Sequence, residues 1–325
     1  MPILTGRKDE IINLAAKMIG SGKVVAIPTE TVYGLGGNIA IDSAIKTIYK
    51  LKNRPKNHPL IVHISDIEQL YEYATQIPKY VEFLAHRFWP GPLTFILPKS
   101  NKVSSLVTGG QDTVAIRMPN HDLTLSLIRT VGHAIAAPSA NKFGNVSPTR
   151  PEHVLTEFMD EIDVMDGGIC NIGIESTIID ATSQDYYRIL RPGPITQNDL
   201  DLVLTNSSTK IRLIDKVVRK ISVPGTHIRH YSPQTPLIIF NNSNQISSLI
   251  KEYHNIYIIH YSNLALHDYN HTYKIIANPL EFAKHLYHAL RLGDKSFSKI
   301  IAIEAPPNEI KWDAIWDRLR RSANQ

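Results

Sequence analysis

The chain has 325 residues, more than a single hydrophobic core usually holds, so we expect two domains. Its 43% hydrophobic content excludes a disordered chain, and its net charge of +5 suits anionic ligands such as nucleotides without establishing nucleic-acid binding. Its single cysteine, Cys170, excludes a disulfide framework or a cysteine-based zinc site within one chain.

Neither a signal-peptide core nor an apolar run near the ~18 residues of a membrane span is visible, so we predict a cytoplasmic protein without membrane association. Strand and helix signals then alternate through the first two hundred residues. The helical periodicity covers residues 8–20, 41–51, 67–73, 78–88, 122–130, 151–159 and 196–203, and short apolar strands are expected at 24–27, 60–64, 94–97, 114–118, 134–137, 177–180 and 187–190. This order predicts an α/β domain over residues 1–205, with a twisted mixed sheet because prolines flank many strands.

Residues 206–235 interrupt the pattern with Ser-, Pro- and Gly-rich stretches, which is typical of an interdomain linker. A second alternating pattern follows over residues 236–325. Strands are expected at 237–240, 256–260, 273–276 and 300–303, and helices at 245–253, 280–292 and 314–321. About ninety residues are enough for a small, doubly wound parallel sheet.

Three polar clusters adjoin regular elements of the first domain. They are the stretch 28–36, which follows a β-branched run, the Lys52-x-Arg54 pair at a helix end, and Ser139-x-Asn141 after another apolar run. Loops at strand ends commonly build binding sites, so we expect one pocket here. The second and third clusters each have an ordinary alternative: a solvated basic helix terminus for Lys52 and Arg54, and a simple turn for Ser139 and Asn141.

Arg117 and Arg191 carry charge at positions where strands are expected. Arg117 lies within an apolar run, so it needs either an anionic ligand or an internal Asp or Glu as its partner, and the sequence leaves both open. Arg191 follows the last strand of the first domain. The chain has no P-loop, no Gly-x-Gly-x-x-Gly and no Gly-x-Ser-x-Gly motif. The scattered histidines 227, 230, 254 and 260 show no metal-binding spacing, and no metal ligands can be assigned.

The chain resembles the YrdC-type L-threonylcarbamoyladenylate synthase family in its long form. The matching motifs are residues 28–36, 52–55, 59–63, 89–94, 114–119, 137–141, 175–177 and 190–193, then 224–233 in the linker, and 304–307 and 317–321 near the end. The resemblance implies a YrdC-like catalytic domain (1–205), a linker that acts as a lid (206–235) and a Rossmann-like C-terminal domain (236–325). It also implies synthesis of threonylcarbamoyl-AMP and pyrophosphate from ATP, L-threonine and bicarbonate, with Mg²⁺ as cofactor.

The resemblance further assigns roles to individual residues. Lys52 and Arg54 are expected to be catalytic through charge. The residues expected to contact ATP are Arg54, His58, Thr113, Ser139, Asn141, Ser147, Arg191 and Tyr231, and those expected to contact L-threonine are Thr31, His63, Arg117, Ala137, Ser176 and Thr177. Arg117 would clamp the threonine carboxylate, and Tyr231 would close over ATP. His58 stands where the family usually has Asn; a backbone contact would survive this change and a side-chain amide contact would be altered.

The product would pass to threonylcarbamoyl-transferase machinery that modifies adenosine 37 of tRNAs reading ANN codons. Glu30 is left open between a base, a metal-linked carboxylate and a turn cap. From another class, the basic balance allows an RNA-binding module without ATP turnover, and the resemblance also allows weak RNA binding by the enzyme itself. A HypF-like carbamoyl-transfer protein is disfavoured, because the chain lacks the cysteines of the HypF zinc-finger segment.

Overall fold

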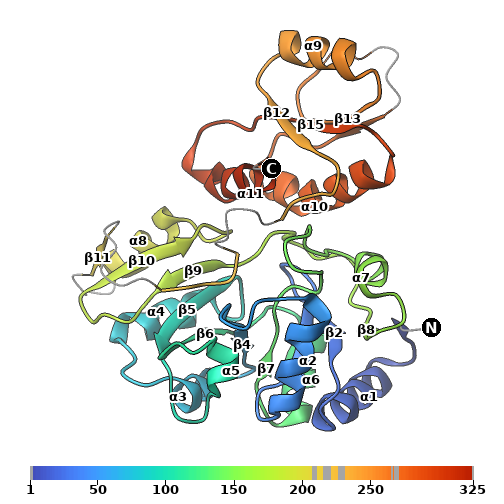
Figure 1. Cartoon of the computed structure of the whole chain (residues 1–325). Helices are drawn as coiled ribbons and strands as arrows, with labels where there is room; N and C mark the ends of the chain where they lie inside the picture. The colour runs from blue at the N-terminus through green and yellow to red at the C-terminus, as the bar shows by residue number, and fades with distance from the viewer. Residues whose placement is uncertain are drawn as a thin grey trace.

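The structure is a computed structural model that describes residues 3–206, 211–214, 221–225, 231–264, 266 and 271–323. Figure 1 shows two bodies, a larger one built from the first two-thirds of the chain and a smaller one built from the last third. Part of the predicted linker motif, residues 226–230 with His227 and His230, lies outside the described residues. Within the described part of the chain, no helix is long and apolar enough to span a bilayer.

The larger body contains a mixed sheet of eleven strands within the described residues. In chain order they are β1 (Ile3–Leu4), β2 (Val25–Ile27), β3 (Gly34–Asn38), β4 (Ile61–His63), β5 (Leu93–Pro98), β6 (Thr113–Arg117), β7 (Ile135–Ala136), β8 (Asp163–Met165), β9 (Thr177–Asp180), β10 (Tyr186–Arg191) and β11 (Arg212–Leu213). Across the sheet the order is β1-β8-β2-β3-β7-β4-β6-β5-β9-β10-β11. Parallel and antiparallel pairs alternate irregularly, which confirms the predicted mixed sheet.

Helices cover this sheet and bury its apolar side chains. They are α1 (Lys8–Gly20), α2 (Asp42–Lys52), α3 (Leu70–Tyr73), α4 (Lys79–Phe88), α5 (Ser105–Thr108), α6 (Asp122–Val131), α7 (Pro151–Phe158) and α8 (Gln197–Asn206), with a 3₁₀ turn at Ile67–Gln69. Helices α1 and α6 pack together through Ile19 and Leu127 over strand β7. A separate core joins α2 and α4 to the central strands, for example through Ile48 and Leu84.

Residues 28–36 were expected to form a loop at a strand end, and for residues 34–36 this expectation is wrong, because they belong to a strand that spans Gly34–Asn38. This strand, β3, pairs with β2 and β7 although Gly-Leu-Gly-Gly-Asn has poor strand propensity. The glycines serve close packing: a β-carbon added at Gly37 would lie 3.0 Å from Ile48 Cδ1 of α2. The glycines thus let the helix sit directly on the strand.

The predicted linker differs from the structure at its start. Helix α8 extends to Asn206, and Arg212–Leu213 forms strand β11, an edge strand paired with β10 of the first sheet. Further along, Val223 packs on the apolar residues Ile61, Ile96, Ala115 and Ile178. Short pairings and one buried valine therefore fix this part of the linker onto the first domain.

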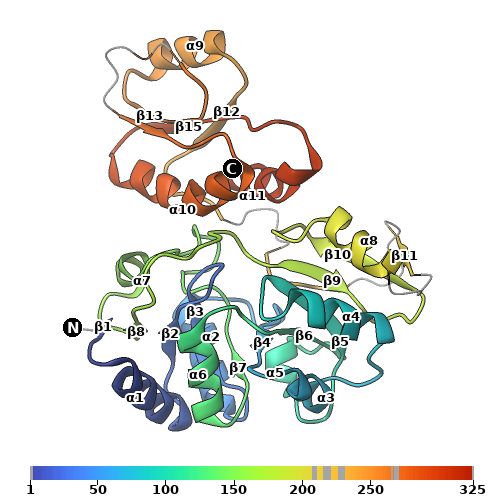
Figure 2. The ribbon, with the colours of Figure 1, turned by 180° about the vertical axis from the view of Figure 1, so that it is seen from behind.

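The smaller body is a parallel four-stranded sheet, as predicted for a Rossmann-like domain. Its strands are β12 (Leu237–Phe240), β13 (Ile256–His260), β14 (Thr272–Lys274) and β15 (Ile300–Glu304), in the order β12-β15-β13-β14. Its helices are α9 (Ser243–Tyr253), α10 (Pro279–Lys295) and α11 (Asp313–Ala323), with a 3₁₀ turn at Ile310–Trp312. Figures 1 and 2 agree that α10 and α11 lie on the side facing the first domain and α9 on the far side.

Polar contacts between α7 and α10 join the two bodies. Arg291 donates to Glu157 Oε1 over 2.9 Å, and His153 Nε2 lies 3.1 Å from His288 Nδ1. The backbone N–H of Thr149 donates to His153 Nδ1, so Nε2 must carry the proton and donate to His288. Burial is the main cause that lowers the pKa of His153 to about 2 and that of His288 to about 4.

We therefore expect the free energy of unfolding to decrease as the pH is lowered below about 6.5, the pKa of an unfolded histidine. The unfolded chain then takes up a proton that native His153 refuses, which costs up to about 1.4 kcal/mol per pH unit. Urea titrations between pH 7 and 5 measure this slope. In the His153→Gln variant the slope should be smaller by about one proton taken up on unfolding. The control variant His133→Gln, at an exposed position, should keep the wild-type slope. Equal slopes in wild type and both variants would contradict the role assigned to His153.

Candidate functional site

Most of the clusters predicted from the sequence surround one cavity of the first domain. Its free volume in this conformation is small, about 40 Å³. Its lining residues come from the sheet, from strand-end loops and from the linker: Thr29, Thr31, Val32, Gly34, Arg54, Ile61, His63, Arg117, Ala137, Pro138, Ser139, Glu175, Ser176, Arg191, Pro224, Gly225 and Tyr231.

Arg117 ends strand β6 and is almost fully buried at 3% exposure. Its Nε donates to the carbonyl of Gly91 over 3.2 Å, and its Nη1 donates to Thr31 Oγ1 over 2.9 Å. Its Nη2 lies 2.5 Å from Glu30 Oε2, yet neither Glu30 oxygen has a hydrogen-bond partner among the described residues. The internal carboxylate that the sequence left open is therefore present, and it offsets the Arg117 charge without using up the guanidinium donors.

The loop after β2 fixes Thr31 in front of Arg117. Thr29 Oγ1 accepts from the backbone N–H of Val32 over 3.1 Å and shares a 2.9 Å hydrogen bond with Thr31 Oγ1. A threonine side chain that hydrogen-bonds its own loop in this way stiffens the turn. Thr31 thus presents a hydroxyl to the cavity in a fixed position.

His63, at the end of β4, lies beside Arg117 in the parallel β4–β6 register. Burial, reinforced by the Arg117 charge, lowers the pKa of His63 to about 3. Its ring is therefore neutral at physiological pH, and Nδ1 lies 3.2 Å from the Ile61 carbonyl. A neutral imidazole adds hydrogen-bonding capacity to the cavity without adding charge.

Lys52 closes helix α2 and ties it to the Ser139–Asn141 loop. Its ammonium lies 2.5 Å from both the Ser139 and the Asn141 carbonyl oxygens. Burial, with Arg54 as the next cause, lowers the pKa of Lys52 well below its ordinary value. Lys52 does not line the cavity. It lies behind the wall and stabilises the loop that carries Ser139.

Asn53 ends helix α2 in a left-handed conformation and turns the chain, so Arg54 points in a different direction from Lys52. Arg54 lines the cavity, and its guanidinium donates to the carbonyls of His58 and Pro59 and lies over the Phe143 ring. Burial is the main cause that lowers its pKa to about 10, which keeps it charged at pH 7. His58 meets Arg54 through its backbone oxygen, so this contact does not depend on the Asn-to-His change.

Arg191 reaches the cavity from the end of β10. Its Nε and Nη2 both donate to the Ser176 carbonyl, at 3.0 and 2.8 Å, and its Nη1 donates to the linker carbonyl of Pro224. Gly193 makes this close approach possible, because a β-carbon there would lie 2.3 Å from the Thr177 nitrogen. The linker thus covers Arg191 directly.

Tyr231 closes the cavity from the other end of the described linker. It is 1% exposed, stacks on Tyr287 of α10 with ring centroids 5.8 Å apart, and has Arg318 of α11 over its face. Ser322 donates to its backbone carbonyl. The C-terminal domain therefore holds the residue that closes the site.

The cavity wall carries more positive than negative charge. Arg54, Arg117 and Arg191 face Glu175, the one carboxylate among its lining residues. Buried arginines in this excess favour an anionic ligand, and their planar forks suit carboxylate or phosphate groups.

Several predicted residues do not line the cavity: Lys52, His58, Thr113, Asn141, Ser147 and Thr177. Thr113 begins strand β6, and Thr177 exchanges hydrogen bonds with the backbone of Ile195. Ser147 donates to Glu175 over 2.6 Å. Between the alternatives Ser176 and Thr177, the structure brings Ser176 to the cavity.

Other lining residues were not predicted: Thr29, Val32, Gly34, Ile61, Pro138, Glu175, Pro224 and Gly225. All of them lie inside the motifs that carry the family resemblance, although none of them was given a role. Glu175 is the most informative of them. A carboxylate is not expected in a pocket for anions, so the sequence gave no reason to predict it there before its partners were known.

The described residues offer no obvious metal cage. Among the described residues, no group of three His, Cys, Asp or Glu side chains gathers at one point. Glu175, which lines the cavity, and Glu30, which lies behind Arg117, each pair with an arginine. A divalent ion would therefore have to arrive with a ligand that brings its own oxygens.

Two family models match the chain. One, the Sua5/YciO/YrdC model described as telomere recombination, covers residues 17–193, and the other, described as the C-terminal domain of threonylcarbamoyl-AMP synthase, covers residues 195–324. Curated relatives named threonylcarbamoyl-AMP synthase include one from Pyrococcus abyssi, 38% identical over 96% of this chain and 94% of its own length. The relative from Bacillus subtilis is 41% identical over 97% of this chain and 93% of its own length.

Other relatives match about half of the chain. The one from Idiomarina loihiensis has the same name and is 34% identical over 51% of this chain and 90% of its own length. Among solved structures, Pyrococcus abyssi Sua5 complexed with L-threonine superposes with a TM-score of 0.88 at 37% identity, covering 99% of this chain and 96% of that one.

Proposed function

Because the chain belongs to the threonylcarbamoyl-AMP synthase family, we propose that its cavity binds L-threonine and ATP side by side and joins them through one carbon of bicarbonate. The synthase activity follows from the family. The arrangement of the substrates is our proposal, and the observation that carries it is the set of three buried arginines facing one cavity.

L-Threonine is assigned to the Arg117 side. The guanidinium N–H groups that are not used by Gly91 and Thr31 would hold its carboxylate. Thr31 and Ser176 would face its hydroxyl, and neutral His63 would stand beside its amine. The solved relative with bound L-threonine supports a threonine site in this fold.

ATP is assigned to the Arg54 and Arg191 side, with Ser139 toward the nucleotide. The Nη1 of Arg191 now meets the Pro224 carbonyl, so phosphate binding there requires the linker to yield this contact. Lys52 fixes the loop that carries Ser139. These fixed charges would stabilise the negative charge that develops as pyrophosphate leaves.

The chemistry then has two balanced steps. The threonine amine attacks the carbon of bicarbonate, and loss of water leaves a carbamate. A carbamate oxygen attacks the α-phosphorus of ATP, the bond to the β-phosphate oxygen breaks, and pyrophosphate departs. The protein's part is to place the two substrates and to exclude water, which would destroy the carbamate. Tyr231 and residues 224–225 provide that cover.

Mg²⁺ would enter as part of the MgATP substrate, held by phosphate oxygens, because Glu30 and Glu175 already pair with arginines. We place the reaction in the cytoplasm, with the product passing to the transferase that modifies tRNA. Weak tRNA binding by this chain stays a proposal, and RNA binding without ATP turnover is set aside, since the family is one of synthases.

Incubation with MgATP, ¹³C-bicarbonate and L-threonine tests the proposal. Mass spectrometry of the quickly quenched mixture should show threonylcarbamoyl-AMP carrying one ¹³C, with one pyrophosphate released for each product. Omission of threonine is the control. Pyrophosphate release that is independent of threonine, or a product without the label, would refute the proposed reaction.

A further inference from the structure

We propose that Arg318, on helix α11 of the C-terminal domain, is a positioning residue for the nucleotide side of the cavity. It neutralises Glu175, the carboxylate among the lining residues, and fixes the backbone against which Arg191 is oriented. This inference rests on the proposed placement of the ATP phosphates near Arg54 and Arg191.

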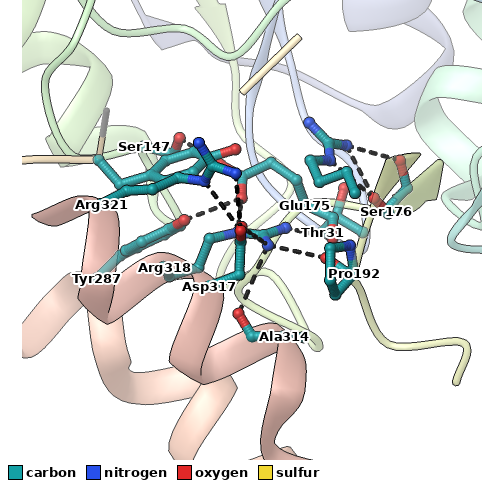
Figure 3. A network of polar contacts seen from close by, with 12 residues as sticks. Thr31, Ser147, Glu175, Ser176, Pro192, Tyr287, Ala314, Asp317, Arg318 and Arg321 are labelled. Atoms are coloured by element: carbon teal, nitrogen blue, oxygen red, sulfur yellow. Dashed lines mark hydrogen bonds and ion pairs between the residues drawn. The ribbon is translucent and has the colours of Figure 1, made fainter. Parts of the chain in front are cut away.

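Arg318 is fully buried and makes directed contacts with the first domain. Its Nε donates to Glu175 Oε2 over 2.9 Å, its Nη2 to the Glu175 carbonyl over 3.2 Å, and its Nη1 to the Pro192 carbonyl over 2.8 Å. Figure 3 shows this fork between the two segments. One side chain of the second domain therefore holds two segments of the first domain, the one before β9 at Glu175 and the one after β10 at Pro192.

The Glu175 carboxylate is satisfied from both domains. Ser147 of the first domain donates to Oε1 over 2.6 Å, and Tyr287 of α10 donates to Oε2 over 2.9 Å. Burial alone would raise the pKa of Glu175, but Arg318 and Arg191 together bring it below its ordinary value. The carboxylate is thus kept ionised beside the proposed phosphate site. Its charge is offset by Arg191 and by Arg318, which also pairs with Asp317 of its own helix over 2.9 Å.

The contacts of Arg318 also affect the position of Arg191. Arg318 holds the Glu175 carbonyl, and Arg191 donates twice to the next carbonyl, that of Ser176. Two arginines from different domains therefore hold consecutive peptide groups. A shift of Glu175 would move the carbonyl that sets the Arg191 guanidinium plane.

A relative with the same name matches only 51% of this chain over 90% of its own length, so a protein of that name does not need the whole of this chain. What the long form adds is a counter-charge and a fixed backbone at residues 175–176. Loss of Arg318 should therefore affect ATP more than L-threonine.

The Arg318→Met variant tests this directly. Without its counter-charge, Glu175 repels the phosphates, and we expect the KM for ATP to rise about tenfold or more and the KM for L-threonine to change less than threefold. The double variant Glu175→Gln with Arg318→Met should return the KM for ATP to within about threefold of wild type, because the repelling charge is gone. Arg320→Met, on the same helix but exposed, is the matched control and should change neither KM.

A pH profile separates positioning from plain packing. In Arg318→Met the Glu175 pKa should rise, so lowering the pH from 8 to 6 should recover ATP binding in this variant but not in wild type. If Arg318→Met does not fold, Arg318→Lys keeps the charge, and its KM for ATP should stay within about threefold of wild type. An unrescued double variant, or equal effects on both substrates, would overturn the inference. An unchanged KM for ATP in Arg54→Met would instead overturn the proposed ATP placement.

Discussion

The double substitution Glu30→Gln with Arg117→Met should raise the KM for L-threonine by about 10²-fold or more and change the KM for ATP by less than about threefold. Arg117 is buried at the cavity, and its remaining N–H groups offer the carboxylate site. Truncating one partner of a buried charged hydrogen bond typically costs about 2–5 kcal/mol.

The paired design removes a confounding effect on folding. Arg117→Met alone would leave the buried Glu30 carboxylate without its counter-ion, a change that typically costs about 3–5 kcal/mol of stability. Changing both residues keeps the net charge of the pair at zero. Glu30→Gln alone is the control, and it should retain threonine binding. Steady-state kinetics with each substrate varied in turn decide the outcome, and a parallel rise of both KM values would argue against a carboxylate clamp.

Lys52→Met is expected to lower kcat/KM for ATP by roughly 10²–10³-fold, the size of effect seen when a fixed donor is lost from an active site. Lys52 bonds the carbonyls of Ser139 and Asn141. The Ser139 carbonyl would keep the backbone N–H of Asn141 as a partner, but the Asn141 carbonyl would lose its Lys52 donor, and a buried carbonyl without a partner costs about 1–3 kcal/mol. The loop would relax and carry Ser139 away from the nucleotide.

The matched control is Lys50→Met, two residues earlier on α2 and exposed to solvent. Both variants lose one positive charge from the same helix, so net charge cannot explain a difference between them. Thermal unfolding should show a lower Tm for Lys52→Met as well. Activity within a few-fold of wild type for Lys52→Met would show that the loop is held by other contacts.

Much of the fold was predictable because its helices and buried strands carry clear periodicity. Residues 177–180, 237–240 and 256–260 form strands where they were expected. Strand β3 was missed because it depends on its neighbours β2 and β7 rather than on its own glycines. Strand β11 was missed for a similar reason, since two residues have no periodicity to detect.

The candidate site was predictable as a set of segments but not as a set of side-chain directions. Thr31, Arg54 and Arg117 face the cavity as expected. Lys52 and Asn141 belong to correctly chosen motifs, yet they stabilise the loop behind the wall. Direction depends on hydrogen bonds between residues far apart in the chain, which no local pattern contains.

The part played by the C-terminal domain was the least visible in the sequence. Glu175 and Arg318 are 143 residues apart, and only the folded chain brings them together (Figure 3). Their contact explains why a carboxylate can line a cavity that otherwise displays arginines. Ser322, on the same helix as Arg318, donates a hydrogen bond to the backbone carbonyl of Tyr231, the residue that closes the cavity.

A crystal structure of the protein with L-threonine and a non-hydrolysable ATP analogue tests the central claim most directly. We expect the threonine carboxylate within hydrogen-bond distance of Arg117, and the analogue's phosphates on Arg54 and Arg191, with Tyr231 closing the same cavity. Threonine bound away from Arg117, or phosphates bound outside the cavity bordered by Arg54 and Arg191, would contradict it.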